Sequence, residues 1–343
     1  ASLDVAVDTL FRQAGVIRTD TLTEMFDVAS LVANQPLPKG RRIGIVTNAG
    51  GPGILAVDAL EANGLEVVEF SDELKAGLRS FLAADAAAGN PVDMIASAGP
   101  NEYAACIDLL MSSNEIDALM AIFIPAAPEG PDEVAVAIRD AAFEHHGEKP
   151  FLTVYMSSGG APDIFSSGER AIPTYQFPEP AALALTRAVE YVEWREKDEG
   201  AILDLSDVDA TRARAIVEGA LDRSGAGWLD PDEVEGVLSA YGLAMPKSAL
   251  ATTADEAVSA ASAIGGPVVL KVVSESALHK SDVGGVVLDV EVEKAVREAF
   301  AAVTAAVPDP EGVLLQQYVE CGHEVLIGMT DDPNFGPLIV LGL

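Results

Sequence analysis

The spacing of apolar residues changes along the chain, and each change predicts a different arrangement of helices and strands. Residues 1–40 hold two helix-like repeats of apolar positions, and Thr21 with Glu24 forms a helix-start signal before the second repeat. From residue 41 to residue 195, short apolar runs rich in valine and isoleucine alternate with longer amphipathic segments. Beyond residue 226 the order becomes helix, strand and helix, followed by further strands around one more helix.

The alternating segment predicts a parallel sheet that is covered by helices on both faces. Its expected strands are residues 42–47, 65–70, 117–125, 149–156 and 172–175, and its expected helices are residues 52–63, 71–82, 103–112, 132–145 and 180–194. Right-handed crossovers between parallel strands then give a flavodoxin-like, doubly wound α/β fold.

The remaining segments predict that the chain contains more than this one domain. Residues 196–226 are charged and punctuated by glycine, and we expect them to be a linker. From residue 227 an α+β order begins, and the chain stops inside a strand-like run, residues 337–343. Residues 1–40 are expected to be helices that trail from an upstream domain. A length of 343 residues agrees with about two domains.

Composition and charge limit the fold class and the classes of partner that the protein can bind. Apolar residues make up 49% of the chain and aromatic residues 6%, which favours α/β layers with interiors of Ala, Val, Leu and Ile. The 54 acidic and 21 basic side chains give a formal charge of −33, which argues against nucleic acid because phosphate binding needs a basic face. No apolar run has membrane length, and the two cysteines lie far apart, so we expect a soluble cytoplasmic protein without a membrane partner or a disulfide framework.

The acidic residues spread over the predicted helices, and a solvated surface that maintains solubility is the simplest interpretation. A sharper hypothesis is adaptation to a high-salt cytoplasm, which fits eight lysines against 13 arginines. Under that hypothesis, refolding yield and stability are expected to rise with KCl concentration, because counter-ions screen repulsion among like charges. Urea unfolding at several KCl concentrations measures this, and full stability in dilute buffer would contradict it.

A glycine-rich turn between strand 42–47 and helix 52–63 is the first candidate site. Its residues are Asn48, Ala49, Gly50, Gly51, Pro52 and Gly53. Glycine lets the backbone approach a ligand, and the free N–H groups of a helix start favour a phosphate or phosphoryl group. The turn matches neither a Walker sequence nor GxGxxG, and many such turns need glycine for steric reasons alone. Nearby, GNPVDM (residues 89–94) predicts an Asx-type turn at the same sheet edge.

A second group of candidates lies in the C-terminal part. Lys271 interrupts an apolar strand, so its ammonium group either reaches water or faces an anion such as a nucleotide phosphate. A polar stretch at the end of strand 312–319 would suit a nucleobase, a ribose or a metal-bound phosphate, although a solvated edge strand explains it equally well. The residues concerned are Gln316, Gln317, Tyr318, Val319 and Glu324.

His279 lies in the turn between strands 267–274 and 284–290. A histidine in a turn is most often a tolerated polar residue. Here Lys280 adds positive charge beside it, and the Gly284-Gly285 pair allows close approach of the backbone. Because imidazole is nucleophilic near neutral pH, His279 is a candidate carrier of a phosphoryl group.

Together these stretches resemble the NDP-forming acyl-CoA synthetases, the ADP-forming acetyl-CoA synthetase group related to succinyl-CoA synthetase. The resemblance covers nearly the whole chain and rests on DTLFRQAGVIRTDTLTEMFDVA, IGIVTNAGGPGILAVDALEANGLEV, NPVDM, GGPVVLKVVSESALHKSDVGGVVL and EVLIGMTDDPNFGPLIVLGL. It implies C-terminal helices of an upstream ligase or CoA domain (1–40), a flavodoxin-like ligase domain (41–195), a linker (196–226) and the first part of an ATP-grasp domain (227–343).

The resemblance also implies a reaction in which a small carboxylic acid, CoA and ATP (or GTP), with Mg²⁺, give acyl-CoA, the nucleoside diphosphate and phosphate through phosphohistidine. His279 would accept the phosphoryl group in a second relay step, Lys271 and Glu324 would belong to the nucleotide cleft, and residues 48–53 would hold the phosphoryl group. The family's Ser-His-Thr-Gly run, CoA-binding Rossmann domain and Mg²⁺-binding acidic residues fall outside this sequence. We therefore expect an oligomer of longer chains.

Two other functions stay open at this point. Relatives that carry an added acetyltransferase domain are regulators that acetylate lysines, and their ligase-like part is degenerate as an enzyme. A non-catalytic phosphate- or nucleotide-binding module is the second alternative. The presence of both His279 and Lys271 favours the synthetase.

Overall fold

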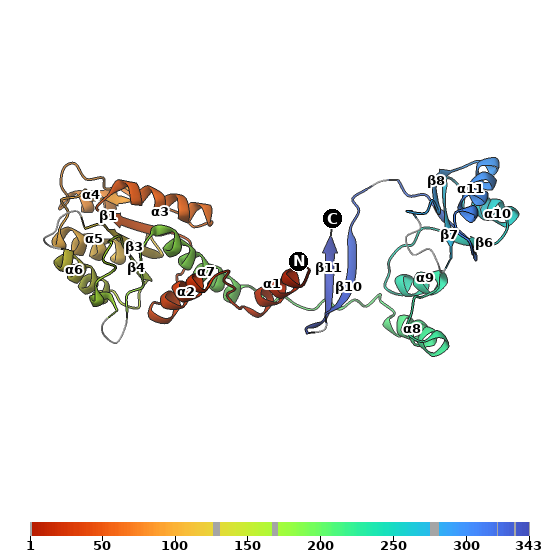
Figure 1. Cartoon of the computed structure of the whole chain (residues 1–343), viewed down its shortest axis with the longest axis horizontal. Helices are drawn as coiled ribbons and strands as arrows, with labels where there is room; N and C mark the ends of the chain where they lie inside the picture. Colours follow the sequence, from red (N-terminus) through yellow and green to blue (C-terminus); the bar gives the residue numbers. More distant parts are fainter. Residues whose placement is uncertain are drawn as a thin grey trace. The chain divides into compact units, whose positions relative to one another are not determined.

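The chain forms two compact units, Ala1–Gly200 and Ala201–Leu343. Figure 1 labels most of their helices and strands. The computed structural model describes residues 2–125, 131–166, 171–274, 281–320, 322–332 and 334–342. No helix in these described ranges is both long enough and apolar enough to cross a membrane.

The first unit is built on a parallel five-stranded sheet with the order β2-β1-β3-β4-β5. Its strands are β1 (Ile43–Thr47), β2 (Val92–Asp93), β3 (Ala118–Phe123), β4 (Phe151–Tyr155) and β5 (Thr174–Tyr175). Every residue of β1, β3 and β4 is buried, as expected for strands that are covered on both faces. This order is the flavodoxin-like one and confirms the predicted fold class.

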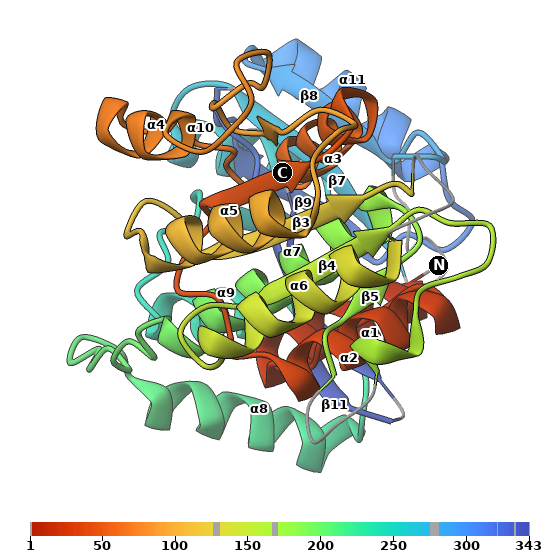
Figure 2. The ribbon, with the colours of Figure 1, turned by 90° about the vertical axis from the view of Figure 1, so that its left-hand side faces the viewer.

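Two layers of helices cover the sheet, and each has its own apolar core. One layer consists of α4 (Asp72–Arg79), α5 (Pro100–Ser112) and α6 (Pro131–Glu144). The other consists of α2 (Leu22–Asn34), α3 (Gly50–Ala62) and α7 (Pro178–Glu196). Figure 2 shows α5 and α6 in front of the strands, with α3 and α7 behind them. A short 3-10 helix, Asp163–Phe165, adds Phe165 to the first core.

The N-terminal segment forms the two predicted helices, α1 (Ser2–Ala14) and α2. The predicted start signal of α2 is confirmed, because the Thr21 hydroxyl accepts a hydrogen bond from the Glu24 amide at 3.1 Å. α2 packs against α7, and its Val28 and Leu31 join the second core. An origin of these helices in an upstream domain stays a prediction.

The predicted strand 65–70 is wrong. In this segment only Glu66 bridges the main sheet, to Arg42 beside β1. Beyond that bridge a side chain replaces the backbone partner of β1. The Ile45 amide donates to Asn90 Oδ1 at 3.0 Å, and Asn90 Nδ2 donates to the carbonyl oxygen of Ile43 at 2.8 Å.

The same Nδ2 group also donates to the carbonyl oxygen of Val68 at 3.0 Å. The carboxamide of Asn90 therefore lies between β1 and residues 65–70 and holds them apart, while β2 pairs with β1 at Val46 and Thr47. The sequence predicted a strand because the segment is a short apolar run, but only Leu65 and Phe70 at its two ends are buried. The hydrogen bonds that would complete a ladder go to Asn90 instead.

The second unit contains an antiparallel four-stranded sheet with the order β6-β9-β7-β8. Its strands are β6 (Ser248–Ala251), β7 (Val268–Val273), β8 (Val286–Val290) and β9 (Gly312–Gln317). α10 (Ala254–Ile264) and α11 (Glu293–Ala305) pack on one face and form a third apolar core. β10 (Leu326–Asp332) and β11 (Gly336–Gly342) pair as an antiparallel hairpin.

The stretch expected to be a linker, residues 196–226, contains a helix, α8 (Ala210–Ser224). Asp209 caps it by accepting a hydrogen bond from the Arg212 amide at 2.9 Å. α8 packs against α9 (Pro231–Ala240), and its buried residues are Ala213 and Ala220. The charged residues and glycines of residues 196–226 indicated a linker, although residues 210–224 form a helix.

Candidate functional site

The glycine-rich turn lies where β1 ends and α3 begins, at the carboxyl edge of the parallel sheet. The order of the strands reverses between β1 and β3, and ligands of doubly wound folds bind outside the strand ends at such a point. Ala49 is the N-cap residue of α3 and makes no side-chain capping hydrogen bond. The first N–H groups of the helix, at Gly50 and Gly51, are therefore available to a ligand as far as the described residues are concerned.

Asn48 positions this turn with its side chain. Its Nδ2 group donates to the carbonyl oxygen of Ile124 at 2.8 Å, and its Oδ1 accepts from the Ile124 amide at 3.0 Å. The buried hydroxyl of Thr47 likewise donates to the Ala49 carbonyl oxygen and accepts from the Ala49 amide. The side chain of Asn48 thus ties β1 to the end of β3, and the backbone of Gly50 and Gly51 is what the turn offers to a phosphoryl group.

Tyr103, on α5, contacts the backbone at the ends of β1 and β3. Its hydroxyl donates to the Ile122 carbonyl oxygen at 2.6 Å. Burial raises the pKa of Tyr103 well above its ordinary value, and a hydrogen bond from the backbone of Asn48 acts in the opposite direction. The phenol therefore stays protonated and links the ends of β1 and β3. Sequence reasoning did not single out Tyr103, because nothing in a helical pattern distinguishes a core tyrosine from one that braces a loop.

The three glycines of the turn have different roles. A Cβ atom on Gly50 would lie 2.8 Å from Asp93 Oδ2, and one on Gly53 would lie 3.1 Å from Thr47 Cγ2. Around Gly51, by contrast, nothing described lies within 4 Å of such an atom. The steric interpretation therefore accounts for Gly50 and Gly53, whereas Gly51 leaves open space beside its amide.

Asp93 places a carboxylate next to the first turn of α3. Its Oδ1 accepts a hydrogen bond from the Ile95 amide at 3.0 Å, which is the geometry of an Asx-type turn. The predicted turn in NPVDM is thereby confirmed, and its position near the same sheet edge follows from the pairing of Asp93 with Thr47. Because Ile95 holds the carboxylate, Asp93 cannot move away from Gly50 without losing that hydrogen bond.

A matched pair of alanine substitutions distinguishes these glycines. We expect Gly51→Ala to leave stability unchanged or to raise it by up to about 1 kcal/mol, because alanine suits a helix better than glycine. We expect Gly50→Ala to be less stable than Gly51→Ala by about 1–2 kcal/mol, because the new methyl group displaces Asp93. Urea unfolding measures both, and equal midpoints would show that the carboxylate moves freely.

In the second unit, the structure brings two of the predicted nucleotide-site residues together. Lys271 Nζ donates to Gln316 Oε1 at 2.6 Å, although 45 positions separate the two residues in the sequence. Antiparallel pairing of β7 with β9 places Val269 opposite Gln316 and Lys271 opposite Leu314. Both polar side chains therefore project from the face of the sheet opposite to α10 and α11, whose core takes Leu270.

The other candidate nucleotide-site residues lie at the end of β9 and after it in the chain. The amides of Gln317 and Tyr318 donate to the carbonyl oxygens of Lys247 and Pro267. Val319 is 67% exposed, and Glu324 is exposed before β10 begins. The alternative of a solvated edge strand is wrong, because β9 lies between β6 and β7.

His279 lies outside the described residues, and so does the turn around it, residues 275–280. The strands predicted before and after this turn are present as β7 and β8, and they pair antiparallel with Lys271 opposite Val286. Gly284 has a positive φ of 75°, which agrees with the expected need for glycine next to this turn. The assignment of a phosphoryl-carrying role to His279 stays a prediction.

Two family models match this chain. A model described as the ATP-grasp domain matches residues 220–343, and a model described as the Ligase-CoA domain matches residues 43–152. The first match contains the Lys271–Gln316 pair, and the second contains the β1–α3 turn.

Two relatives that are ADP-forming CoA ligases match almost all of the chain. The 4-hydroxybutyrate–CoA ligase (ADP-forming) of Nitrosopumilus maritimus is 30% identical over 99% of this chain and 49% of its own length. The acetate–CoA ligase (ADP-forming) I of Archaeoglobus fulgidus is 34% identical over 97% of this chain and 48% of its own length. The chain therefore spans about half the length of these relatives.

Solved structures agree with these matches. The crystal structure of PH0766 from Pyrococcus horikoshii OT3 is 36% identical, with a TM-score of 0.53 over 57% of this chain and 46% of that chain. The dinucleotide forming acetyl-coenzyme A synthetase 1 of Ca. Korarchaeum cryptofilum, in complex with phosphate and ADP, is 26% identical. Its TM-score is 0.51 over 56% of this chain and 41% of that chain.

Proposed function

Because the chain belongs to the NDP-forming acyl-CoA synthetase family, we propose that it works in an ADP-forming acyl-CoA synthetase. The reaction converts a carboxylic acid, CoA and ATP (or GTP) into acyl-CoA, ADP (or GDP) and phosphate. The observation that carries this proposal is the presence of both family domains in one chain, each with its own candidate phosphate contact. These contacts are the start of α3 in one unit and Lys271 in the other.

The nucleotide is proposed to bind on the face of the four-stranded sheet that lies opposite to α10 and α11. The ammonium group of Lys271 neutralises phosphate charge there, and Gln316 fixes its position through the 2.6 Å hydrogen bond. Residues Gln317 to Val319 and the carboxylate of Glu324 contact the base and the ribose or the metal-bound phosphates. Mg²⁺ usually needs only one or two protein carboxylates beside the nucleotide phosphates, and Glu324 is suited to such a role. The described residues contain no cluster of three or more His, Cys, Asp or Glu side chains for a metal.

The phosphoryl group is proposed to pass through His279. A ring nitrogen attacks the γ-phosphorus, the bond to the β-phosphate oxygen breaks, and ADP leaves with that oxygen. The start of α3 receives the phosphoryl group at a later stage, where the N–H groups of Gly50 and Gly51 and the helix dipole favour an anion. CoA and the acid are substrates of the same enzyme. An oligomer of longer chains in the cytoplasm, with no nucleic acid or membrane as partner, completes the proposal.

The test is an assay of the intact enzyme with ATP, CoA and a panel of short, branched and aromatic carboxylic acids. We expect acyl-CoA, ADP and phosphate to form in equal amounts with at least one acid, and to depend on all three substrates. ATP-independent transfer of acetyl groups from acetyl-CoA to lysine would indicate the regulatory acetyltransferase instead. Nucleotide binding without turnover of any acid would indicate a binding module.

A further inference from the structure

The carboxylate of Asp93 lies against the start of α3. A Cβ atom on Gly50 would lie 2.8 Å from Asp93 Oδ2 and 3.9 Å from Asp93 Cγ, so Oδ2 is the carboxylate atom that faces the helix backbone. The other oxygen, Oδ1, accepts the hydrogen bond from the Ile95 amide. The negative charge of Asp93 therefore lies beside the N–H groups of Gly50 and Gly51, which are proposed to hold a phosphoryl group.

Backbone contacts fix this position of Asp93. The residue is paired with Thr47 in the sheet, and its amide and its carbonyl oxygen both hydrogen-bond to Ala87, at 3.1 Å and 2.9 Å. Ile95 has a positive φ of 60°, which a β-branched residue rarely adopts. The turn that directs the carboxylate to Gly50 is thus kept although it costs conformational energy, and Asp93 has little freedom to withdraw from a ligand there.

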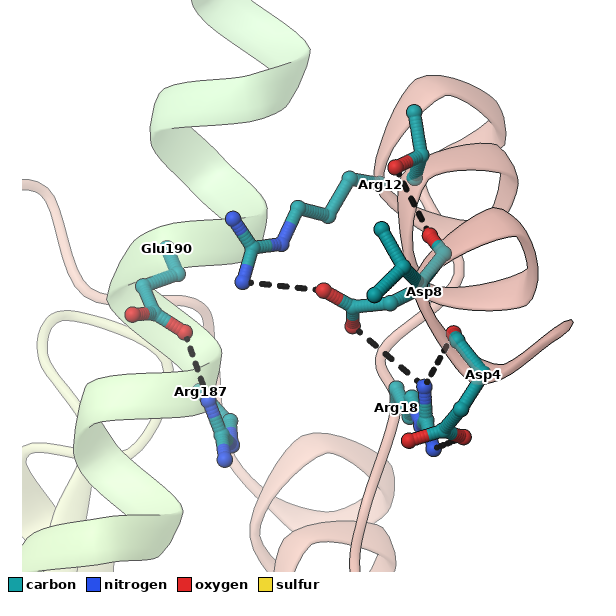
Figure 3. Close-up of polar contacts among 8 residues, drawn as sticks. Asp4, Asp8, Arg12, Arg18, Arg187 and Glu190 are labelled. Carbon is teal, nitrogen blue, oxygen red and sulfur yellow. Dashed lines mark hydrogen bonds and ion pairs between the residues drawn. The ribbon is translucent and has the colours of Figure 1, made fainter. Parts of the chain in front are cut away.

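The positive side chains of the first unit lie elsewhere. Its described ion pairs all use carboxylates other than that of Asp93. Figure 3 shows three of its arginines, Arg12, Arg18 and Arg187, each joined to an acidic residue of α1 or α7. The segments that follow β1, β2, β3 and β4 contain no lysine, arginine or histidine in residues 48–53, 94–99, 124–125 and 156–160. Within these segments, only backbone N–H groups oppose the charge of the carboxylate.

Helix α3 brings no anionic side chain of its own to this position. Its N-cap, Ala49, makes no side-chain hydrogen bond, and its first turn has no acidic residue. A helix start carries a partial positive charge that favours a negative group beside it. Asp93 supplies that group from the neighbouring strand, and this is its structural role. A phosphate on the same N–H groups is attracted by the helix and repelled by Asp93.

We propose that Asp93 weakens the binding of phosphate at the start of α3, so that the phosphate formed together with acyl-CoA leaves the enzyme quickly. The inference rests on the proposed acyl-CoA synthetase function and adds a residue that controls product release. Like charges a few ångströms apart near a protein surface change an affinity by about threefold to thirtyfold, and most of such a difference appears in the dissociation rate. N–H groups and a helix dipole without this carboxylate would retain the anion for longer.

Product inhibition of the intact enzyme tests this role. Acyl-CoA formation is measured at saturating ATP, with an acid that the enzyme uses and with increasing inorganic phosphate. Asp93→Asn keeps the size of the side chain, and its amide oxygen still accepts from the Ile95 amide, but the charge is gone. Its inhibition constant for phosphate is expected to be about threefold to thirtyfold lower than that of the native enzyme. Asp93→Ser also removes the carboxylate and is expected to shift the constant in the same direction.

Salt separates an effect of charge from an effect of packing. Charges are screened beyond about 10 Å at roughly 0.1 M KCl and beyond about 3 Å at roughly 1 M KCl. The ratio of the native inhibition constant to that of Asp93→Asn is therefore expected to fall toward one as KCl rises. A ratio that stays constant would overturn the proposal, because Asp93 would then act through the shape of the turn.

The matched control is Glu148→Gln, which removes one negative charge at the opposite edge of the same sheet. Glu148 is exposed and lies just before β4. The inhibition constant of this variant is expected to equal the native one, and a decrease as large as that of Asp93→Asn would overturn the proposal by showing an effect of net charge alone.

Urea unfolding verifies that the variants are folded. Native unfolding midpoints together with an unchanged inhibition constant in both Asp93 variants would overturn the role of Asp93 and leave the proposed synthetase function intact. A native enzyme that forms no acyl-CoA with any acid would instead overturn the proposed function itself.

Discussion

Replacing His279 with alanine is expected to lower ATP-dependent acyl-CoA formation by roughly a thousandfold or more, since a covalent relay without its nucleophile has no alternative path of similar rate. The lysine that neutralises phosphate charge, Lys271, would remain in place on β7. Binding of ATP is therefore expected to stay within a few fold of the native value, so the loss falls on turnover. The measurement is initial velocity together with nucleotide affinity in the intact enzyme.

Labelling of the enzyme with γ-labelled ATP tests whether His279 carries a phosphoryl group. The native enzyme is expected to carry an acid-labile, base-stable label, as phosphohistidine does, and His279→Ala is expected to lose the part of that label carried at His279. A first phosphohistidine elsewhere in the enzyme would keep some label, so acyl-CoA formation decides the question. His146→Ala, in the first unit, serves as a matched histidine control. Normal turnover of His279→Ala would exclude the proposed relay.

Replacing Asn90 with leucine is expected to lower the free energy of unfolding by about 3 kcal/mol. The variant loses three hydrogen bonds at once, to the Ile45 amide and to the carbonyl oxygens of Ile43 and Val68. Each contributes about 1 kcal/mol, and the backbone groups of Ile43 and Ile45 that lose their partner belong to fully buried residues. The free energy of unfolding of Asn90→Asp is expected to lie between those of the native chain and Asn90→Leu. Its carboxylate still accepts from the Ile45 amide but repels the carbonyl oxygens of Ile43 and Val68.

Urea unfolding with a probe in the first unit measures this effect. Asn63→Ala is the control, because Asn63 is an exposed asparagine whose side chain donates to the Ala59 carbonyl oxygen of its own helix. Its stability is expected to stay within about 0.5 kcal/mol of the native chain. If Asn90→Leu unfolds at the native midpoint, then water or a backbone shift replaces the carboxamide, and its assigned structural role is incorrect.

Asn90 also shows where sequence reasoning about the fold reaches its limit. The apolar runs of β1, β3 and β4 predicted buried parallel strands, and these are present because complete burial leaves a strong pattern. The same pattern in residues 65–70 predicted a strand that does not form. Periodicity reports which side chains are buried, but not whether a backbone or a side chain supplies the facing hydrogen bonds.

The candidate sites, like the fold, could be predicted only in part from the sequence. Lys271 and Gln316 could each be singled out as polar residues in apolar strands, but their contact depends on the register of β7 with β9, which no local pattern contains. The turn after β1 could be recognised from its glycines. Whether a given glycine serves a ligand or a neighbouring side chain depended on Asp93, which is 43 positions from Gly50 and becomes its neighbour only through the pairing of β2 with β1.

The short outer strands of the first unit have a consequence for its solubility. Both β2 and β5, which flank the sheet, contain only two residues, and Asn90 occupies part of the outer side of β1. A long, flat outer strand would present a row of unused amides and carbonyls that recruits strands from other molecules. The first unit presents no such row along its described edges, so its own sheet, with a valine- and isoleucine-rich interior, has little means of starting edge-to-edge aggregation.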